Sequence, residues 1–237
     1  AKERLLELLA EKRRAVITHA VTRGLKGDVS LRDSGVEWLG EIPSHWEVEY
    51  ARWLFKEIDE RSTEHNEEEL LSVSHLTGVT SRAEKDVNMF MAESNEGYKI
   101  CRQGDLVINT LWAWMGAMGI AFQDGIVSPA YNVYRLREKY IPEYIDLLVR
   151  IPIFAQEVIR YSRGVWSSRL RLYPEEFFKV QMPVPPISEQ KEIVEHVKSQ
   201  TEKIDRLSEL AKSTIERLHE RRTSLISAVV SGQLKVV

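Results

Sequence analysis

The chain has 237 residues, of which 33 are Lys or Arg and 36 are Asp or Glu, so its formal net charge is -3. Its 43% hydrophobic content, with six Trp, eight Tyr and six Phe, supports a sizeable core and excludes wholesale disorder. The single cysteine, Cys101, excludes a disulfide framework and a cysteine-clustered zinc site. We therefore expect a cytoplasmic protein. The global charge does not suggest a strongly basic nucleic-acid binder, although it cannot show local patches.

Residues 2–22 have the pattern of a helix. Leu5, Leu8 or Leu9, Val16 and Ala20 recur at helical spacing, and Gly24 provides a stop. Charges throughout this stretch exclude the apolar core of a signal peptide. The segment through Lys26 carries seven bases and three acids, so it is a basic helix.

Residues 27–183 have a different pattern, with short apolar runs separated by Gly, Pro, Asn and Asp. The runs LLSVSHL, DLVINTL, IAF and NVYRL predict strands, and one helix is expected over 142–161. The uncharged run 106–122 reaches the lower length limit of a membrane span, about 17 residues. Asn109, Gly116 and Gly119 interrupt it, so we favour two buried strands around a Trp-rich turn and expect no membrane association. The fold class is α+β.

A long helix is expected over 188–230. Prolines at 183, 185 and 186 hold the chain extended, Ser188 is the expected N-cap, and Gly232 ends the helix. Its length would be about 65 Å at 1.5 Å per residue. Steps of four and three residues define a coiled-coil seam, whose members are Ile193, Val197, Ile204, Leu207, Ala211, Leu218 and Leu225. The alternatives are pairing with another helix, which the alternating charges favour, and packing of one amphipathic helix against its own domain.

The two ends of the chain resemble each other. Aligning 5–25 with 214–234 gives seven identical pairs, from Glu7 with Glu216 to Leu25 with Leu234. Any two amphipathic helices share some leucine and glutamate positions, but the agreement extends through the helix exit. We therefore predict one complete middle domain, 27–183, between equivalent helix ends at 1–26 and 184–237.

Three stretches resemble the DNA specificity (S) subunit of type I restriction-modification systems. They are EWLGEIPSHWEV at 37–48, GDLVINTLWAWMGAMGIAFQDGIVSPAYNVYRL at 104–136, and SSRLRLYPEEFFKVQMPVPPISEQKEIV at 167–194. The helix ends EKRRAVITHAVTRGL and ERRTSLISAVVSGQL are similar to the ends of that family's spacer regions. Full-length members have two target-recognition domains joined by two long helices. This chain has one such domain, so it resembles a half-length S subunit or a fragment of a longer one.

The resemblance implies a non-catalytic protein without a cofactor. Its target-recognition domain would bind one half of a bipartite site in double-stranded DNA. Its helices would dock the type I methyltransferase (M) subunit and, through the complex, the restriction (R) subunit. Antiparallel pairing of two long helices would give a two-fold homodimer and a palindromic, interrupted target.

One segment has the composition of a DNA contact. Residues 161–172, YSRGVWSSRLRL, contain bases and no acid, whereas 41–69 contains ten acids and three bases. Arginine binds phosphates and the guanine edge, and serine hydroxyls bind phosphates. The candidate DNA-binding residues of this segment are Arg163, Trp166, Ser167, Ser168, Arg169 and Arg171. The alternative is a strand whose arginines pair with the acidic 41–69 segment.

Two weaker candidate contacts lie elsewhere. The segment 80–85 predicts a surface turn with Arg82 and Lys85, although Glu84 and Asp86 flank Lys85. Trp112 and Trp114 would support a base or line a groove, or else pack in the core or a hairpin. Asn109 is a candidate adenine-binding residue.

The rival functions are an enzyme and a scaffold. A methyltransferase needs a glycine-rich cofactor loop, yet no two glycines here are two residues apart. A nuclease needs clustered carboxylates, and PEEFFK at 174–179 is better interpreted as a helix start. The histidines have no metal-binding spacing, so we expect no metal site. A coiled-coil scaffold or interaction protein without direct DNA recognition explains 188–230 but not the basic, Trp-containing segment.

Overall fold

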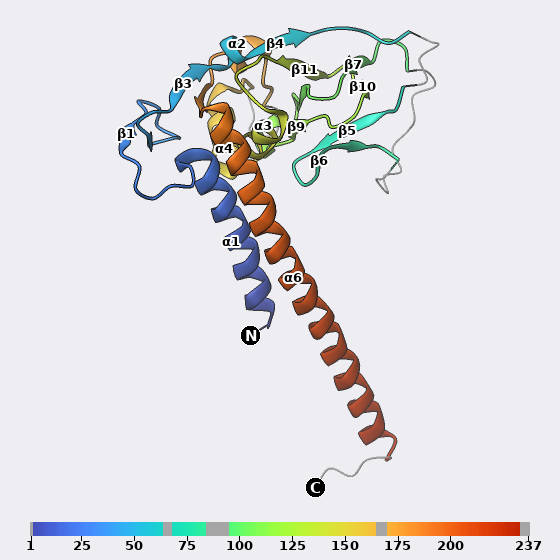
Figure 1. Ribbon diagram of the computed structural model, residues 1–237. Coiled ribbons are helices and arrows are strands. Elements are labelled where there is room, and N and C mark those ends of the chain that lie inside the picture. Colours follow the sequence, from blue (N-terminus) through green and yellow to red (C-terminus); the bar gives the residue numbers. More distant parts are fainter. Residues whose placement is uncertain (1, 64–67, 84–94, 165–169, 233–237) are drawn as a thin grey trace. The chain divides into compact units, whose positions relative to one another are not determined.

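The computed structural model describes residues 2–63, 68–83, 95–164 and 170–232 (Figure 1). The chain divides into two compact units. One is the mixed domain Thr18–Val194, and the other is a helical unit formed by Ala1–Ile17 together with Glu195–Val237.

The mixed domain is built around a four-stranded antiparallel sheet. Its strand order is β4 (Phe55–Ile58), β11 (Tyr131–Leu136), β8 (Leu106–Asn109) and β9 (Met118–Ile120). All four residues of β8 are buried, as its uninterrupted apolar sequence predicts for a strand covered on both faces. Val133 of β11 pairs with Ile58 on one side and with Val107 on the other, and these residues belong to the hydrophobic core.

The described residues also form four two-stranded antiparallel sheets. They are β1 (Leu31–Asp33) with β2 (Glu41–Pro43), β3 (Glu47–Tyr50) with β12 (Gln181–Val184), β5 (Leu71–Ser74) with β6 (Gly78–Ser81), and β7 (Lys99–Cys101) with β10 (Gly125–Val127). The α+β class and the strands expected from the four apolar runs are confirmed. Cys101 lies in the core, and burial raises the pKa of its thiol to about 12, so the side chain is an unreactive apolar group.

The helices of the mixed domain are short: α2 (Ala51–Leu54), η1 (Ala113–Met115), α3 (Pro142–Val149), α4 (Pro152–Tyr161) and α5 (Pro174–Phe177). The single helix expected over 142–161 is wrong, because the chain leaves the helical conformation at Ile151. Pro152 disfavours a helical residue before it and has no N–H to continue the hydrogen-bond ladder. The expected helix start at PEEFFK is confirmed as α5.

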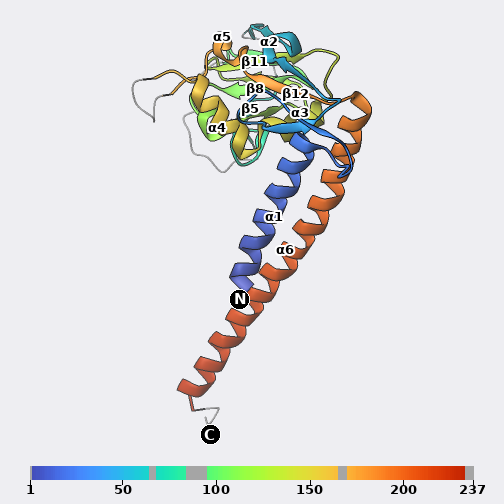
Figure 2. The same ribbon diagram turned by 90° about the vertical axis from the view of Figure 1, so that its left-hand side faces the viewer.

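The helical unit contains most of α1 (Lys2–Arg23) and of α6 (Ile187–Val230), which lie side by side and antiparallel (Figures 1 and 2). Arg13 pairs with Asp205 at 3.2 Å, and Leu9, Val197, Ile204 and Ala211 are buried. Gly24 and Gly232 adopt positive φ values and end the two helices, as predicted. The expected N-cap is wrong, because α6 begins at Ile187 and Ser188 lies inside it. None of the helices in the described ranges has the length and apolar content that a bilayer crossing requires.

The first turn of α6 is tied to the mixed domain by Gln190, which is fully buried. Its Oε1 accepts the backbone N–H of Ile141 at 2.9 Å, and its Nε2 donates to the carbonyls of Lys139 and Pro185. The next residue toward the N-terminus, Glu189, accepts from Trp46 Nε1 at 2.8 Å. The PPISEQ junction therefore holds the first turn of α6 in the mixed domain.

Candidate nucleic-acid interface

A groove of about 470 Å³ opens between the β5–β6 hairpin and the turn that follows β8. Its described lining includes Ser72, Ser128 and Tyr131, together with Arg82 and Trp112. No described residue that lines it is an Asp or a Glu. The groove therefore offers hydrogen-bond donors, one fixed positive charge and an aromatic surface, without a carboxylate that would repel a phosphate.

The Trp-rich turn contributes Trp112 to the lining of this groove. Asn109, at the end of β8, holds the turn in place through two hydrogen bonds. The backbone carbonyl of Asn109 accepts from Trp112 N–H at 3.0 Å, and its Oδ1 accepts from Leu111 N–H at 3.3 Å. Gly116 takes φ 84°, which allows the chain to return as β9. Two strands around a Trp-rich turn are thus confirmed for the 106–122 run.

The two tryptophans of this turn stack on each other. Their ring centroids are 6.2 Å apart at an interplanar angle of 20°, and Trp114 Nε1 donates to the carbonyl of Leu111 at 3.0 Å. Trp114 is partly buried, whereas Trp112 is 52% exposed. The inner ring therefore supports the outer one, and Trp112 presents aromatic surface to solvent at the edge of the groove.

Arg82 and Tyr131 also line the groove, and Tyr131 pairs with Asn109 in the β8–β11 ladder. Thr80 and Ser81, which were expected on a surface turn, are instead the last residues of β6, and the chain bends only after them. The backbone N–H of Arg82 donates to the Leu70 carbonyl at 2.9 Å. Burial raises the pKa of Tyr131, with the Arg82 guanidinium acting in the opposite direction, so the phenol keeps its proton as a donor. Lys85 lies outside the described residues.

The predicted arginine segment is held by a backbone bridge between Arg163 and Arg171. Arg163 and Arg171 form an isolated antiparallel bridge in which each backbone N–H donates to the other's carbonyl at 2.9 Å. Between them, Trp166, Ser167, Ser168 and Arg169 lie outside the described residues. The described ends thus bring the side chains of Arg163 and Arg171 to one place on the surface, where both are exposed.

Arg163 does not pair with the described part of the acidic 41–69 segment, although the alternative interpretation of the sequence predicted such a pair. Arg163 pairs with Glu176 of α5, which is outside the acidic 41–69 segment, and Lys179 donates to the same carboxylate at 2.9 Å. Arg171 has no ion pair within the described part of the chain. Because Glu176 is already paired with two bases, it is not a free carboxylate of the kind a nuclease site needs.

One backbone contact brings the arginine segment to the Trp-rich turn. The N–H of Leu172 donates to the carbonyl of Thr110 at 3.2 Å, and Thr110 Oγ1 donates to the carbonyl of Ala130 at 2.8 Å. Thus Arg82, Asn109 and Trp112 lie around one groove, and the segment that follows Arg171 is bonded to the turn at Thr110. Arg163 and Arg171 do not belong to the described lining of the groove itself.

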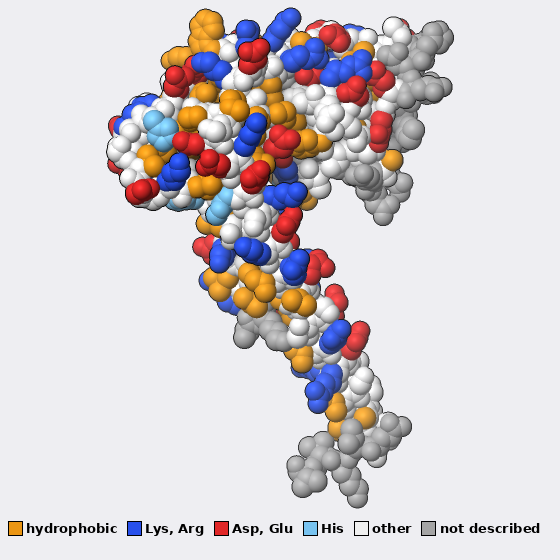
Figure 3. All heavy atoms as spheres, in the orientation of Figure 1, with side chains coloured by type: hydrophobic (Ala, Val, Ile, Leu, Met, Phe, Trp, Pro, Cys, Tyr) orange, Lys and Arg blue, Asp and Glu red, His pale blue; other side chains and the backbone are white. Residues whose placement is uncertain are grey.

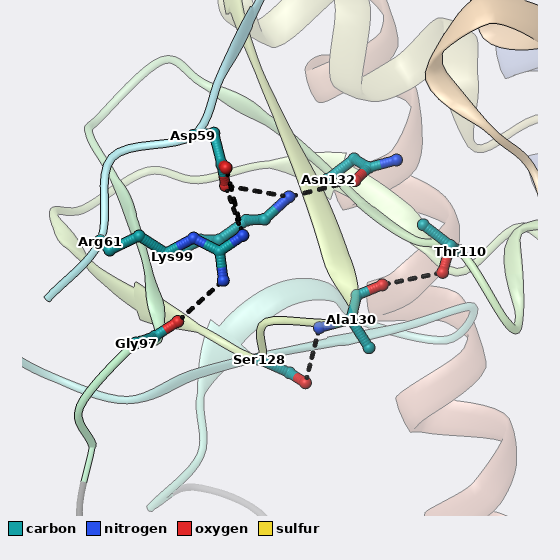
Figure 4. A network of polar contacts seen from close by, with 8 residues as sticks. All are labelled: Asp59, Arg61, Gly97, Lys99, Thr110, Ser128, Ala130 and Asn132. Atoms are coloured by element: carbon teal, nitrogen blue, oxygen red, sulfur yellow. Dashed lines mark hydrogen bonds and ion pairs between the residues drawn. The ribbon is translucent and has the colours of Figure 1, made fainter.

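Polar contacts hold the 128–132 segment (Figure 4). Lys99 is only 5% exposed, and its Nζ donates to Asn132 Oδ1 at 3.2 Å and lies 3.5 Å from Asp59 Oδ1. Arg61 also pairs with Asp59, and this hydrogen bond lowers the pKa of the carboxyl group. A buried lysine that is paired in this way fixes the start of β11, from which Tyr131 faces the groove.

Sequence reasoning missed Ser72, Ser128 and Tyr131 as groove residues, together with buried Lys99. Each sits in or beside an ordinary strand, and only the pairing of distant strands brings them together. Within the described ranges, no three His, Cys, Asp or Glu side chains are grouped as ligands for a metal ion.

Comparison with known proteins shows the fold. No protein-family model matches the chain, and no curated protein matches it. The specificity subunit HsdS from Thermoanaerobacter tengcongensis is similar over 98% of this chain and 53% of its own, with a TM-score of 0.58 and 15% identity.

Two further solved structures agree. A structure described as showing complex assembly and conformational transition of the type I R-M system is similar over 96% of this chain and 54% of its own. The TM-score is 0.60 and the identity is 15%. The type I S subunit from M. genitalium matches 94% of this chain and 56% of its own, with TM-score 0.51 and 14% identity. The chain thus has the fold of type I specificity subunits and spans about half the length of the structures that it matches. The family resemblance noted in the sequence is confirmed at the level of the fold.

Proposed function

We propose that this chain is the DNA-recognition component of a type I restriction-modification complex and binds one half of a bipartite site in double-stranded DNA. The observation that carries the proposal is the groove of Arg82, Asn109 and Trp112, whose described lining contains no carboxylate. Exposed Arg171, next to Leu172 that bonds the Trp-rich turn at Thr110, adds a positive charge without an ion-pair partner among the described residues. Phosphate contacts would set the register, and the groove residues would contact base edges.

Within this proposal, residues 27–183 are the target-recognition domain, and 1–26 and 184–237 are the helix ends that connect recognition domains. The chain itself is not an enzyme. It docks an adenine methyltransferase subunit, which carries out the chemistry, and the complex then engages the restriction subunit.

The exposed leucines of α6 support pairing of two copies. Leu207, Leu218 and Leu225 are between 47% and 53% exposed, although all three occupy seam positions of the coiled-coil pattern. By contrast Val197, Ile204 and Ala211, on the same seam, are buried. An antiparallel two-fold pair of α6 helices would cover the exposed leucines and place one recognition domain at each end of the paired helices.

The test is to purify the chain with its cognate adenine methyltransferase and map the methylated adenines on a random DNA library. The expected result is methylation within a two-part, palindromic sequence of fixed gap. A stable complex that methylates without sequence preference would reject DNA recognition and support the alternative of a coiled-coil scaffold.

A further inference from the structure

Within the described residues, the outer edge of β3 has no strand partner. There β3 pairs with β12, in the register Glu49 with Met182 and Val48 with Pro183. Just beyond the ladder, Ala51 N–H donates to the Val180 carbonyl at 2.8 Å. Because antiparallel strands alternate between residues that bond the partner and residues that face away, Glu47 and Glu49 bond β12, and the backbone groups of Val48 and Tyr50 face away from it.

The far side of β12 supports this alternation independently. The carbonyl of Gln181 accepts from Trp38 Nε1 at 3.2 Å, and the carbonyl of Pro183 accepts from the hydroxyl of Tyr140 at 2.8 Å. These two carbonyls therefore point away from β3. Side chains of the domain cover this edge of β12, whereas no described residue outside the β3–β12 pair bonds the backbone of Val48.

A shallow, open depression adjoins β3 and α2. Val48, Glu49, Tyr50, Trp53 and Lys139 line it. Trp53 is 63% exposed and Tyr50 is 41% exposed. Figure 3 shows hydrophobic side chains gathered over β3 and α2, with charged side chains around them. Tryptophan and tyrosine are the residue types that most often anchor protein–protein interfaces.

The side chains of this edge fit a peptide. Lys139 pairs with Glu49 and lies 3.7 Å from Glu47, whose side chain is still 69% exposed. The guanidinium of Arg52 lies over the Tyr50 ring, 4.9 Å from its centre. An extended peptide that brings an apolar side chain to Trp53 and a basic side chain to Glu47 would be complementary.

We propose that the free edge of β3 docks an extended segment of the methyltransferase subunit, which adds as a strand to the β3–β12 sheet. This inference rests on the proposed function. The partner's backbone bonds the N–H groups of Val48 and Tyr50, its apolar residue packs on Trp53, and a basic residue pairs with Glu47.

Hydrogen exchange measured on the chain alone and in the methyltransferase complex tests the proposal. The amides of Val48 and Tyr50 should exchange at least tenfold more slowly in the complex. A complex that forms while these amides exchange at an unchanged rate would overturn the docking site and leave the proposed function intact. If the wild-type chain binds no methyltransferase, both are overturned.

Two variants sharpen the test. Val48→Pro removes the outward N–H but none of the bonds to β12, and edge strands tolerate proline at such positions. It should weaken methyltransferase binding at least tenfold with an unchanged melting temperature.

Glu47→Lys is the second variant, which tests the site even if Val48→Pro does not fold. It should weaken methyltransferase binding and reduce the salt dependence of that binding. Leu76→Ala, at a site 75% exposed, is the control and should bind as wild type. Wild-type affinity in folded Val48→Pro or in Glu47→Lys would overturn the site.

Discussion

The guanidinium of Arg163 pairs with the carboxylate of Glu176, a side chain that is only 9% exposed. Lys179 donates to the same oxygen, so two bases hold one carboxylate. Arg163 is thereby fixed at the base of the arginine segment, while its backbone partner Arg171 keeps a side chain without an ion pair in the described chain. Two arginines that look equivalent in the sequence thus have different surroundings.

The Glu176 cluster predicts a pH dependence of stability. The hydrogen bond from Lys179, with the charge of Arg163, lowers the pKa of Glu176 below its ordinary value of 4.5. The charged carboxylate therefore stabilises the fold above about pH 4.5, and this stabilisation is lost as the pH falls through the lower, folded-state pKa. Glu176→Gln should lower the melting temperature most near pH 7, and the difference from wild type should shrink toward pH 3.

Glu175→Gln is the matched control for this measurement, because Glu175 is exposed and has no ion pair in the described part of the chain. It should follow the wild-type melting curve across the same pH range. A Glu176→Gln deficit that is constant from pH 7 to pH 3 would show that the carboxylate does not stabilise the fold through its charge.

The two arginines should differ in their contribution to DNA binding. Arg171→Ala should weaken binding of the methyltransferase complex equally on all sequences and reduce the salt slope of log K by about 0.9, as expected for one lost phosphate contact. Arg163→Ala should have a smaller effect, because Glu176 already neutralises that charge. Fluorescence anisotropy between 50 and 200 mM salt measures both slopes. A larger slope change for Arg163→Ala would contradict the assignment.

Trp112 should contribute to affinity for the specific sequence. Trp112→Ala removes a half-exposed ring and should leave the fold intact while costing about 1–3 kcal/mol of specific DNA binding at saturating methyltransferase. Phe122→Ala is the control, since it removes a ring that is 49% exposed and lies outside the described lining of the groove. It should leave DNA affinity unchanged under these conditions. Equal losses in the two variants would argue against a specific role for Trp112.

The sequence predicted the strands and the helix ends better than it predicted the residues that line the groove. Buried β8 follows from its apolar run, and the ends of α1 and α6 follow from Gly24 and Gly232. The break at Ile151 was detectable from Pro152, but the apolar pattern on either side of it suggested one helix. The groove was not predictable, because Ser72 and Tyr131 meet only after β5 and β11 take their places around β8. Strand pairing over long sequence separations leaves no periodic signal in the chain.

Gly125 is expected to be essential for packing. A Cβ at this position would lie 2.5 Å from the carbonyl oxygen of Glu69 and 2.8 Å from Leu71 Cγ. Because the first of these is backbone, the strand would have to move, and Gly125→Ala should destabilise the domain by about 1–3 kcal/mol. Gly27→Ala is the control, since no atom lies within 4 Å of its Cβ position. Urea denaturation measures both changes, and equal stability of the two variants would contradict the predicted clash.

The length of α6 should set the gap between the two half-sites. Seven residues inserted after Leu218, copying the preceding heptad, keep the seam in register and lengthen the helix by about 10.5 Å at 1.5 Å per residue. Because base pairs rise about 3.4 Å each, the gap in the methylated sequence should grow by about three base pairs while the half-sites stay the same. Sequencing of methylated DNA reads the gap directly.

A four-residue insertion at the same place distinguishes the effect of helix length from the effect of α6–α6 pairing. It shifts the seam by a partial heptad, so the exposed leucines at 218 and 225 no longer face a continuous partner stripe. This variant should lose the dimer in sedimentation experiments, and its methylation of the bipartite site should fall. If both insertions leave the dimer and the gap unchanged, the helix does not act as the spacer. If the heptad insertion lengthens the gap while the four-residue insertion breaks the dimer, pairing along α6 determines the spacing.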